Sequence, residues 1–148
     1  MYNHFPDMAS LIRVCTEHGM RETGTPTPEA WVHIADPAAR LERALDDMYS
    51  YYRRNSSVLR SVLRDLGMMI QVGGVEPFLE RMGALFGALA AGWPGDGRSQ
   101  HLRAAAIGHA MAYDTWRSFA DNDVADADIL ALMVQMVTTI SPVLTRDA

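Results

Sequence analysis

The side chains that most often carry catalysis or bind metals are sparse in this 148-residue sequence and show no recognisable spacing. Histidines stand at positions 4, 18, 33, 101 and 109, and no two have the i, i+4 spacing that places two metal ligands on one helix face. Asp121-Asn122-Asp123 begins like a calcium loop, but the sixth position is Asp126 instead of glycine and the twelfth is Leu132 instead of glutamate. No glycine-rich phosphate loop or G-x-S-x-G motif occurs. We therefore expect no metal, no cofactor and no enzymatic activity.

Cys15 is the only cysteine, so an internal disulfide is impossible. It stands among Leu11, Ile12 and Val14 in a segment with helical patterning, which favours a small buried thiol over a reactive one. The sequence lacks the charged-then-apolar start of a signal peptide, and no apolar run reaches the roughly 18 to 20 residues that a membrane span needs. We expect a cytoplasmic protein with no membrane partner.

The methionine and aromatic residues of the sequence would suit the binding of a small apolar or aromatic molecule. Methionine and aromatic side chains recur at helical spacing on four predicted helices, and such walls with few polar tips suit an apolar ligand. If these helices surround a cavity, its lining would comprise Met48, Tyr49, Tyr52, Val62, Met69, Phe78, Met82, Phe86, His109 and Tyr113. For each residue taken singly, ordinary core packing is favoured over a ligand contact, since stripes at helical spacing are usually core. His109, on an otherwise apolar face, needs a polar partner, which could be Tyr52, Tyr113, a backbone carbonyl or a ligand.

Helix-start signals and apolar periodicity predict the elements that would position these side chains. At Asp36-Pro37 an aspartate N-cap precedes a proline at the first helical position, and apolar residues then recur at spacings of three and four to about Arg54. Asn55-Ser56-Ser57 breaks and recaps this pattern before a second helix. Further helices are predicted over residues 7–20, 76–93, 99–121 and 125–140. No strand-like alternation occurs, so the expected fold is an all-α helical bundle.

The last two predicted helices carry more apolar surface than one small bundle would cover. We expect them to pair with the same two helices of a second copy in a two-fold four-helix interface, which makes the protein a homodimer. The interface residues would be Ile107, Met111, Ile129, Leu130, Met133, Val134, Met136, Val137 and Ile140.

Length and composition are those of one globular domain, with 49% hydrophobic and 21% charged residues. The formal net charge of −5 gives the chain no general attraction for nucleic acid. Any contact with DNA would have to be local.

The first eleven residues carry a resemblance to a known family. Tyr2-Asn3-His4-Phe5, followed by Leu11, resembles the signature Tyr-x-His-Phe-x-x-x-x-x-Leu that closes the helix-turn-helix of tetracycline-repressor-like (TetR) transcriptional regulators. Helix number and order also fit, so the resemblance spans nearly the whole chain. The segments that are similar to one branch of the family are Trp31, Ala35-Asp36-Pro37, Arg40-Leu41, Tyr49, Tyr51-Tyr52-Arg53-Arg54, Leu63-Arg64-Asp65 and Tyr113-Asp114-Thr115-Trp116-Arg117.

The resemblance implies a one-component regulator with an N-terminal DNA-reading domain, a C-terminal domain that binds a small-molecule effector, and dimerisation through the last two helices. Residues 1–20 would be the remnant of the DNA-binding domain, and residues 21–148 the ligand-binding and dimerisation domain. Tyr2 and His4 match the end of the recognition helix, where side chains contact phosphates without reading bases. Packing of the Tyr2 ring in the small DNA-domain core is an equal alternative. Met8 departs from the family, where lysine is frequent.

A complete helix-turn-helix of this family needs roughly 40 residues ahead of Tyr2. We therefore expect binding of operator DNA only when that region is present, and no sequence-specific DNA binding by this polypeptide alone. The alternative function is a stand-alone helical small-molecule-binding or dimerisation module with no DNA binding of its own. A small helical enzyme is a third class, without positive evidence.

Overall fold

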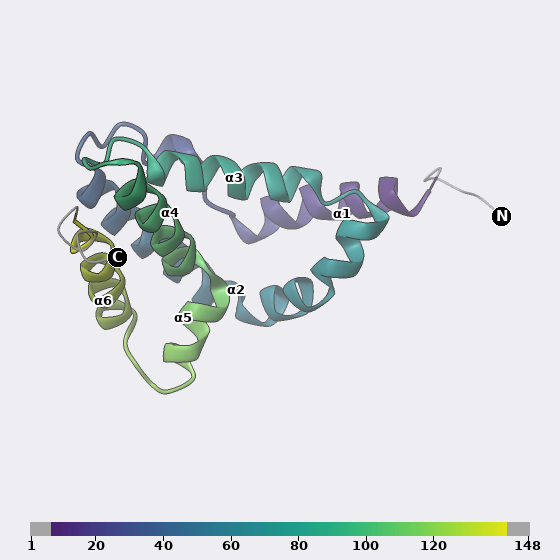
Figure 1. The fold of residues 1–148 in the computed structure, drawn as a ribbon. Coiled ribbons are helices and arrows are strands. Elements are labelled where there is room, and N and C mark those ends of the chain that lie inside the picture. The colour runs from purple at the N-terminus through teal and green to yellow at the C-terminus, as the bar shows by residue number, and fades with distance from the viewer. Residues whose placement is uncertain (1–6, 142–148) are drawn as a thin grey trace.

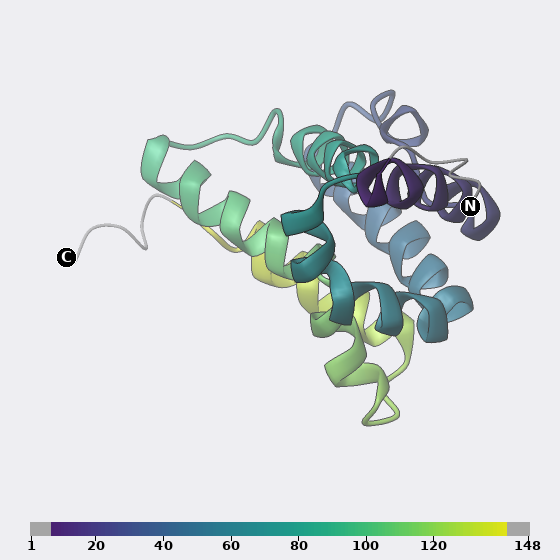
Figure 2. The ribbon, with the colours of Figure 1, turned by 90° about the vertical axis from the view of Figure 1, so that its right-hand side faces the viewer.

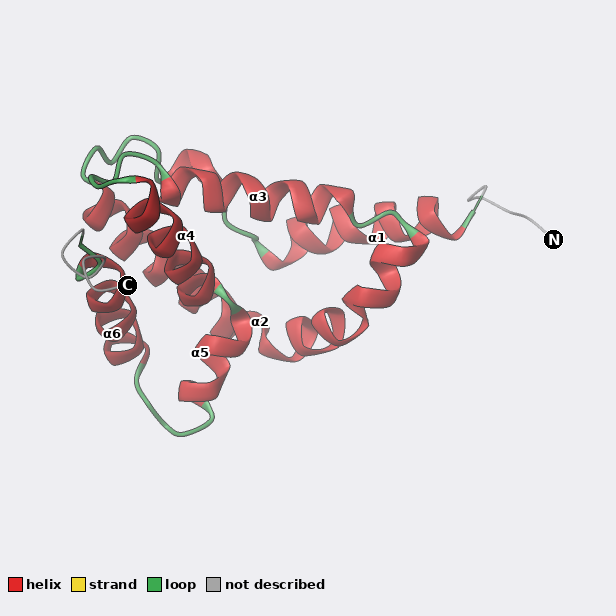
Figure 3. Cartoon of the chain, in the orientation of Figure 1, coloured by secondary structure: helices red, strands yellow, loops and turns green. Residues whose placement is uncertain are grey.

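The computed structural model describes residues 7–141, which form α-helices, one short 3-10 helix and no strand (Figures 1 and 3). The prediction of an all-α helical bundle is confirmed. Tyr2 and His4 lie outside the described residues. Across this range, no helix has the length and apolar character that crossing a membrane requires. The elements are α1 (Met8–Thr23), η1 (Pro28–Ala30), α2 (Pro37–Val72), α3 (Glu76–Ala90), α4 (Gly97–Met111), α5 (Tyr113–Ala120) and α6 (Asp126–Thr138).

Aspartate side chains start three of these helices. Asp7 accepts a hydrogen bond from the Ser10 amide at 2.7 Å, and Asp36 accepts one from the Ala39 amide at 2.8 Å. Asp96 does the same at the start of α4. Each carboxylate satisfies an amide that has no partner within its helix. The starts predicted at Asp7 and Asp36 are thereby confirmed.

The end of α1 lies one turn beyond the prediction. Gly24 adopts the left-handed conformation with φ 67°, and its amide bonds to carbonyls of the last turn. Gly19, which the sequence suggested as the stop, lies inside the helix. Cys15 is exposed instead of buried, because α1 contributes no fully buried side chain.

A kink at Asn55 divides α2 into two halves. Asn55 leaves the helical conformation, with φ −118° and ψ 19°. Its side-chain amide donates to the carbonyl of Tyr51 at 2.9 Å and to the carbonyl of Thr23, in the last turn of α1, at 3.1 Å. The predicted break at residues 55–57 is thus present as a kink within one helix, and it is joined to the end of α1. The two halves point in different directions (Figure 1).

The prediction of one long helix over residues 99–121 was wrong, because the helix is interrupted at Ala112, which separates α4 from α5. Ala112 is extended, with φ −66° and ψ 132°. The carbonyls just before the break accept hydrogen bonds from side chains of α2: the Tyr49 hydroxyl donates to Ala110 at 2.7 Å, and the Tyr52 hydroxyl donates to Met111. These bonds stand in for the helical bonds that a continuous helix would make.

The core is built around α2, which contacts each of the other five α-helices. Most buried residues of α2 lie in its first half, and α1 and α3 lie side by side (Figures 1 and 2). Helix α3 runs back from the end of α2 toward its start, where the Arg40 guanidinium donates to the Ala91 carbonyl. The loop before α3 crosses α1 closely at Gly74, where φ is 98° and a Cβ atom would lie 2.2 Å from the Ala9 carbonyl oxygen. Only glycine fits there. The kinked α2 therefore faces α1 and α3 on one side and α4 and α5 on another.

Candidate functional site

Two apolar cavities lie against α2 on either side of a wall formed by Tyr51, Leu59 and Phe78, which line both. The smaller has a volume of about 170 Å³ and lies between α1, the second half of α2 and the start of α3. The larger has a volume of about 300 Å³ and lies between α2, α3 and the break between α4 and α5. The smaller is also lined by Cys15, Thr16, Gly19, Met20, Thr23, Thr25, Val58, Val62, Leu66, Met69 and Val75, and the larger by Met48, Tyr52, Leu63, Met82, Phe86, Gly108, Met111, Ala112 and Tyr113.

Most of the residues predicted from the sequence to line a cavity are brought together here, although in two groups. Val62 and Met69 line the smaller cavity, and Phe78 lines both. The predicted residues that line the larger cavity are Met48, Tyr52, Met82, Phe86 and Tyr113.

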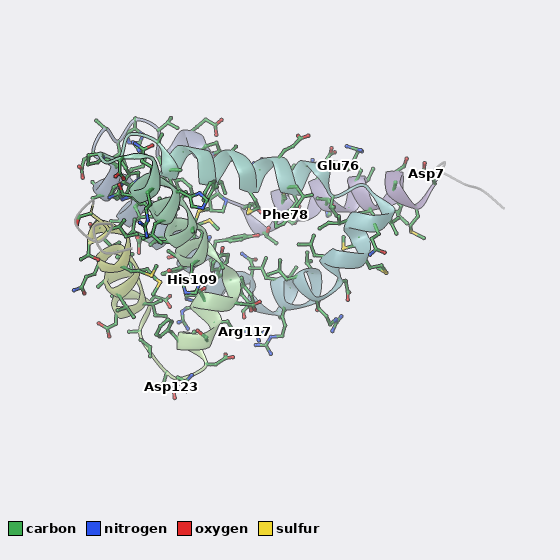
Figure 4. The ribbon with its side chains drawn as sticks, in the orientation of Figure 1. Asp7, Glu76, Phe78, His109, Arg117 and Asp123 are labelled. Carbon is green, nitrogen blue, oxygen red and sulfur yellow. The ribbon has the colours of Figure 1, made fainter. Side chains whose placement is uncertain are left out.

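Tyr49 and His109 line neither cavity. Tyr49 is a core residue, 1% exposed, and its hydroxyl donates a hydrogen bond to the Ala110 carbonyl. His109 is exposed on α4, and its Nδ1 atom lies 3.2 Å from the Thr115 hydroxyl (Figure 4). The sequence reading chose the wrong face of α4, because the buried face is the one that carries Ile107 and Ala110.

Sequence reasoning missed Tyr51 and Leu59 in the shared wall. Tyr51 is 4% exposed although it lies off the apolar stripe of the first half of α2. It is buried because α1 and the chain after it cover a second side of α2: the Thr25 hydroxyl donates to the Tyr51 oxygen at 3.1 Å. The signal available in the sequence was the dense aromatic run at residues 49–52.

The polar groups of the larger cavity are used within the protein. The Tyr52 hydroxyl donates to the Met111 carbonyl, and burial raises the pKa of this phenol above its ordinary value, so it stays protonated. The Tyr113 hydroxyl lies 2.7 Å from the Ser56 hydroxyl, at the kink of α2. A ligand in the larger cavity would therefore meet aromatic rings and methionine side chains and few open polar atoms.

The smaller cavity has a chain of hydroxyl groups at its α1 end. The Thr23 hydroxyl donates to the Gly19 carbonyl at 2.7 Å and lies 3.2 Å from the Thr25 hydroxyl, which in turn bonds Tyr51. A tyrosine hydroxyl has one donor and two acceptor positions. With Thr25 as its hydrogen-bond partner, Tyr51 keeps a position open at this end of the smaller cavity.

Neither cavity is lined by a charged side chain. Moving a charged group from water into such a space, without a partner of opposite charge, is strongly unfavourable. The geometry and chemistry of this site therefore suit uncharged, mostly apolar molecules.

An ionic cluster lies next to the kink, outside the two cavities. Arg53 donates two hydrogen bonds to Asp126, at 2.8 and 2.6 Å, and its guanidinium lies 5.3 Å from the centre of the Trp116 ring. The Trp116 indole N–H donates to the same carboxylate at 3.0 Å. The hydrogen bonds from Arg53 lower the pKa of Asp126 below its ordinary value. The cluster joins α2, just before the kink, to α5 and to the start of α6.

The interface predicted for a homodimer needs correction. Six of its residues are buried within one chain, because α6 and α4 pack on α2: Ile107, Met111, Ile129, Met133, Val137 and Ile140. Leu130, Val134 and Met136 are partly buried. The more exposed apolar side chains on these two helices are Leu102, 47% exposed, and Leu132, 46% exposed.

Within residues 7–141, no group of three or more His, Cys, Asp or Glu side chains is arranged to hold a metal ion. Comparison of the chain with protein-family models, with curated proteins and with solved structures gives no match.

Proposed function

We propose that this chain is the small-molecule-binding and dimerisation part of a ligand-responsive transcriptional regulator of the tetracycline-repressor-like kind, acting in the cytoplasm. The pair of uncharged, apolar cavities at the kink of α2 carries the proposal. Ligand pockets are typically apolar and hold a few placed polar groups, and Tyr51 provides such a group here. The effector would be an apolar or aromatic small molecule.

The position of α1 supports a regulatory role for such binding. This helix lines the smaller cavity through Thr16 and Met20, and its other end leads back to the residues that resemble the close of a DNA-reading domain. A ligand that fills the cavity would change the contacts of α1 with α2. Operator DNA would be a partner only together with a complete helix-turn-helix.

Dimerisation would use the outer faces of α4 and α6. Leu102 and Leu132 are about half exposed, and the partly buried Leu130, Val134 and Met136 lie on the same helix as Leu132. A two-fold axis would bring each patch onto its copy. Light scattering coupled to size-exclusion chromatography tests this: Leu132→Arg should produce a monomer and Leu79→Arg, exposed on α3, should not. A monomeric unmodified chain at micromolar concentration would exclude the interface.

Ligand binding is tested by thermal-shift and calorimetric titration of neutral aromatic and aliphatic compounds. Met82→Trp places a large ring in the larger cavity, whereas Leu79→Trp makes a similar change at a position on α3 that is 41% exposed. We expect saturable binding that Met82→Trp weakens at least tenfold and Leu79→Trp preserves. Failure of every compound to bind the unmodified chain would contradict the proposal.

The alternative, a stand-alone helical binding or dimerisation module, shares this ligand test. The two are separated by the coding sequence in frame ahead of Met1, which for a regulator specifies the remainder of the helix-turn-helix.

A further inference from the structure

We infer that the two cavities form one elongated site, and that its ligand is a single uncharged molecule with a hydrocarbon chain that passes Phe78. The inference rests on the proposed ligand-binding function and adds the shape and charge of the ligand.

The wall between the cavities consists of side chains. Tyr51, Leu59 and Phe78 line both spaces, and of these Phe78 is only partly buried. A phenylalanine ring can swing about its side-chain torsions without breaking a hydrogen bond. The cavities of about 170 and 300 Å³ are each at or below the size of a typical ligand pocket, roughly 300 to 1,000 Å³, whereas together they fall inside that range.

The combined space runs along α3. Val75, the N-cap of α3, lines the smaller cavity; along the helix, Phe78 lines both cavities, and Met82 and Phe86 line the larger. At about 1.5 Å per helical residue, Val75 to Phe86 spans about 16 Å. Figure 4 labels Phe78 on the side of α3 that faces the second half of α2. A space that follows a helix in this way fits a linear chain better than a compact ring system.

The lining of the two cavities favours an uncharged ligand. Neither cavity has a charged side chain in its lining, so a carboxylate or an ammonium group held against these walls would lose water without gaining a partner of opposite charge. The open position on Tyr51, beside Thr25, suits a hydroxyl or carbonyl group at the α1 end of the smaller cavity. The chemical class is a neutral aliphatic alcohol, ketone or ester.

The length of the combined site is tested with straight-chain alkanols from hexanol to hexadecanol. Their binding to the full chain is measured by displacement of the neutral fluorophore Nile red. Each buried methylene should tighten binding about fourfold. In the unmodified protein this gain should continue until the chain fills both cavities. In Val62→Phe, which plugs the smaller cavity, the gain should stop at a shorter alkanol. Val72→Phe, on the same helix but 42% exposed and outside both cavities, should follow the unmodified protein.

Met69→Phe is a second plug of the smaller cavity, in case Val62→Phe does not fold by circular dichroism. The same limiting length in the unmodified protein and in a folded plug variant would overturn the elongated site. So would displacement of Nile red by naphthalene but by no alkanol, a result that leaves the proposed function standing. Failure of Nile red, naphthalene and every alkanol to bind would overturn both.

Discussion

The hydroxyl of Tyr52 donates a hydrogen bond to the backbone carbonyl of Met111, the last residue of α4. Tyr52 lies one turn before the kink of α2, and Met111 lies just before the break between α4 and α5. The two irregular points of the fold are thus bonded to each other. The larger cavity lies beside this contact, because both residues line it.

The bonds from Tyr49 and Tyr52 should stabilise the break at Ala112. Tyr52→Phe keeps the ring and leaves the buried Met111 carbonyl without its partner, which should lower the free energy of unfolding by about 1 to 2 kcal/mol. Tyr49→Phe should do the same through the Ala110 carbonyl. Urea unfolding followed by circular dichroism measures both. Ser61→Ala removes an exposed hydroxyl from α2 and should change little; equal effects in all three would show that the break does not depend on the tyrosines.

The same two tyrosines should make the fold sensitive to alkali. Burial raises the pKa of both Tyr49 and Tyr52 above the ordinary value of 10.0. Above pH 10 the unfolded chain loses phenolic protons that the folded chain keeps, so the unfolded state binds fewer protons and stability falls as the pH rises. The contribution is complete below pH 10. Urea unfolding at several pH values between about 8 and 11 should show this fall, and the Tyr49→Phe/Tyr52→Phe double variant should show a shallower one.

Local chemistry explains which parts of the fold could be predicted. The starts at Asp7 and Asp36 depend on hydrogen bonds to residues three positions away. The kink at Asn55 depends on its side-chain amide, which competes with the helix backbone for the carbonyl of Tyr51. The break at Ala112 could not be predicted, because the hydroxyl groups that satisfy the preceding carbonyls come from residues about sixty positions earlier in the chain.

The second feature that the sequence could not predict is which face of a helix is buried. Apolar residues occur on two sides of α4, and only packing against α2 decides that Ile107 is buried while Leu102 is 47% exposed. The assignment of His109 to a cavity, and of Ile107 and Met111 to a dimer interface, followed from choosing the other side of α4. The cavity residues on α3 were predicted because Phe78, Met82 and Phe86 lie four apart on one face.

The ion pair of Arg53 and Asp126 should couple α2 to α6. A double-mutant cycle with Arg53→Ala and Asp126→Ala should give a coupling energy of about 0.5 to 1 kcal/mol, since the pair is partly exposed but doubly hydrogen-bonded. The adjacent pair Arg64 and Asp65 is more exposed and should give a coupling near zero. Because the pKa of Asp126 is lowered in the folded state, its contribution is present at neutral pH and is lost as the pH falls below about 4. A coupling that is the same for both pairs, or that persists at low pH, would contradict this role.

Tyr51 should distinguish ligands by their polar group more than by their size. Its oxygen keeps an open hydrogen-bonding position beside Thr25 in the smaller cavity, while its side chain contributes to the wall between the two cavities. Tyr51→Phe should therefore weaken the binding of dodecanol about threefold to tenfold, the worth of one neutral hydrogen bond, and leave the binding of dodecane unchanged. Because the substitution also removes the bond to Thr25, urea unfolding must show that most of the variant is folded at the assay temperature. Thr25→Val removes that bond but keeps the Tyr51 hydroxyl; because Thr25 also lines the smaller cavity, any effect of this variant should be the same on dodecanol as on dodecane. Equal weakening of dodecanol and dodecane binding by Tyr51→Phe would assign Tyr51 to packing alone.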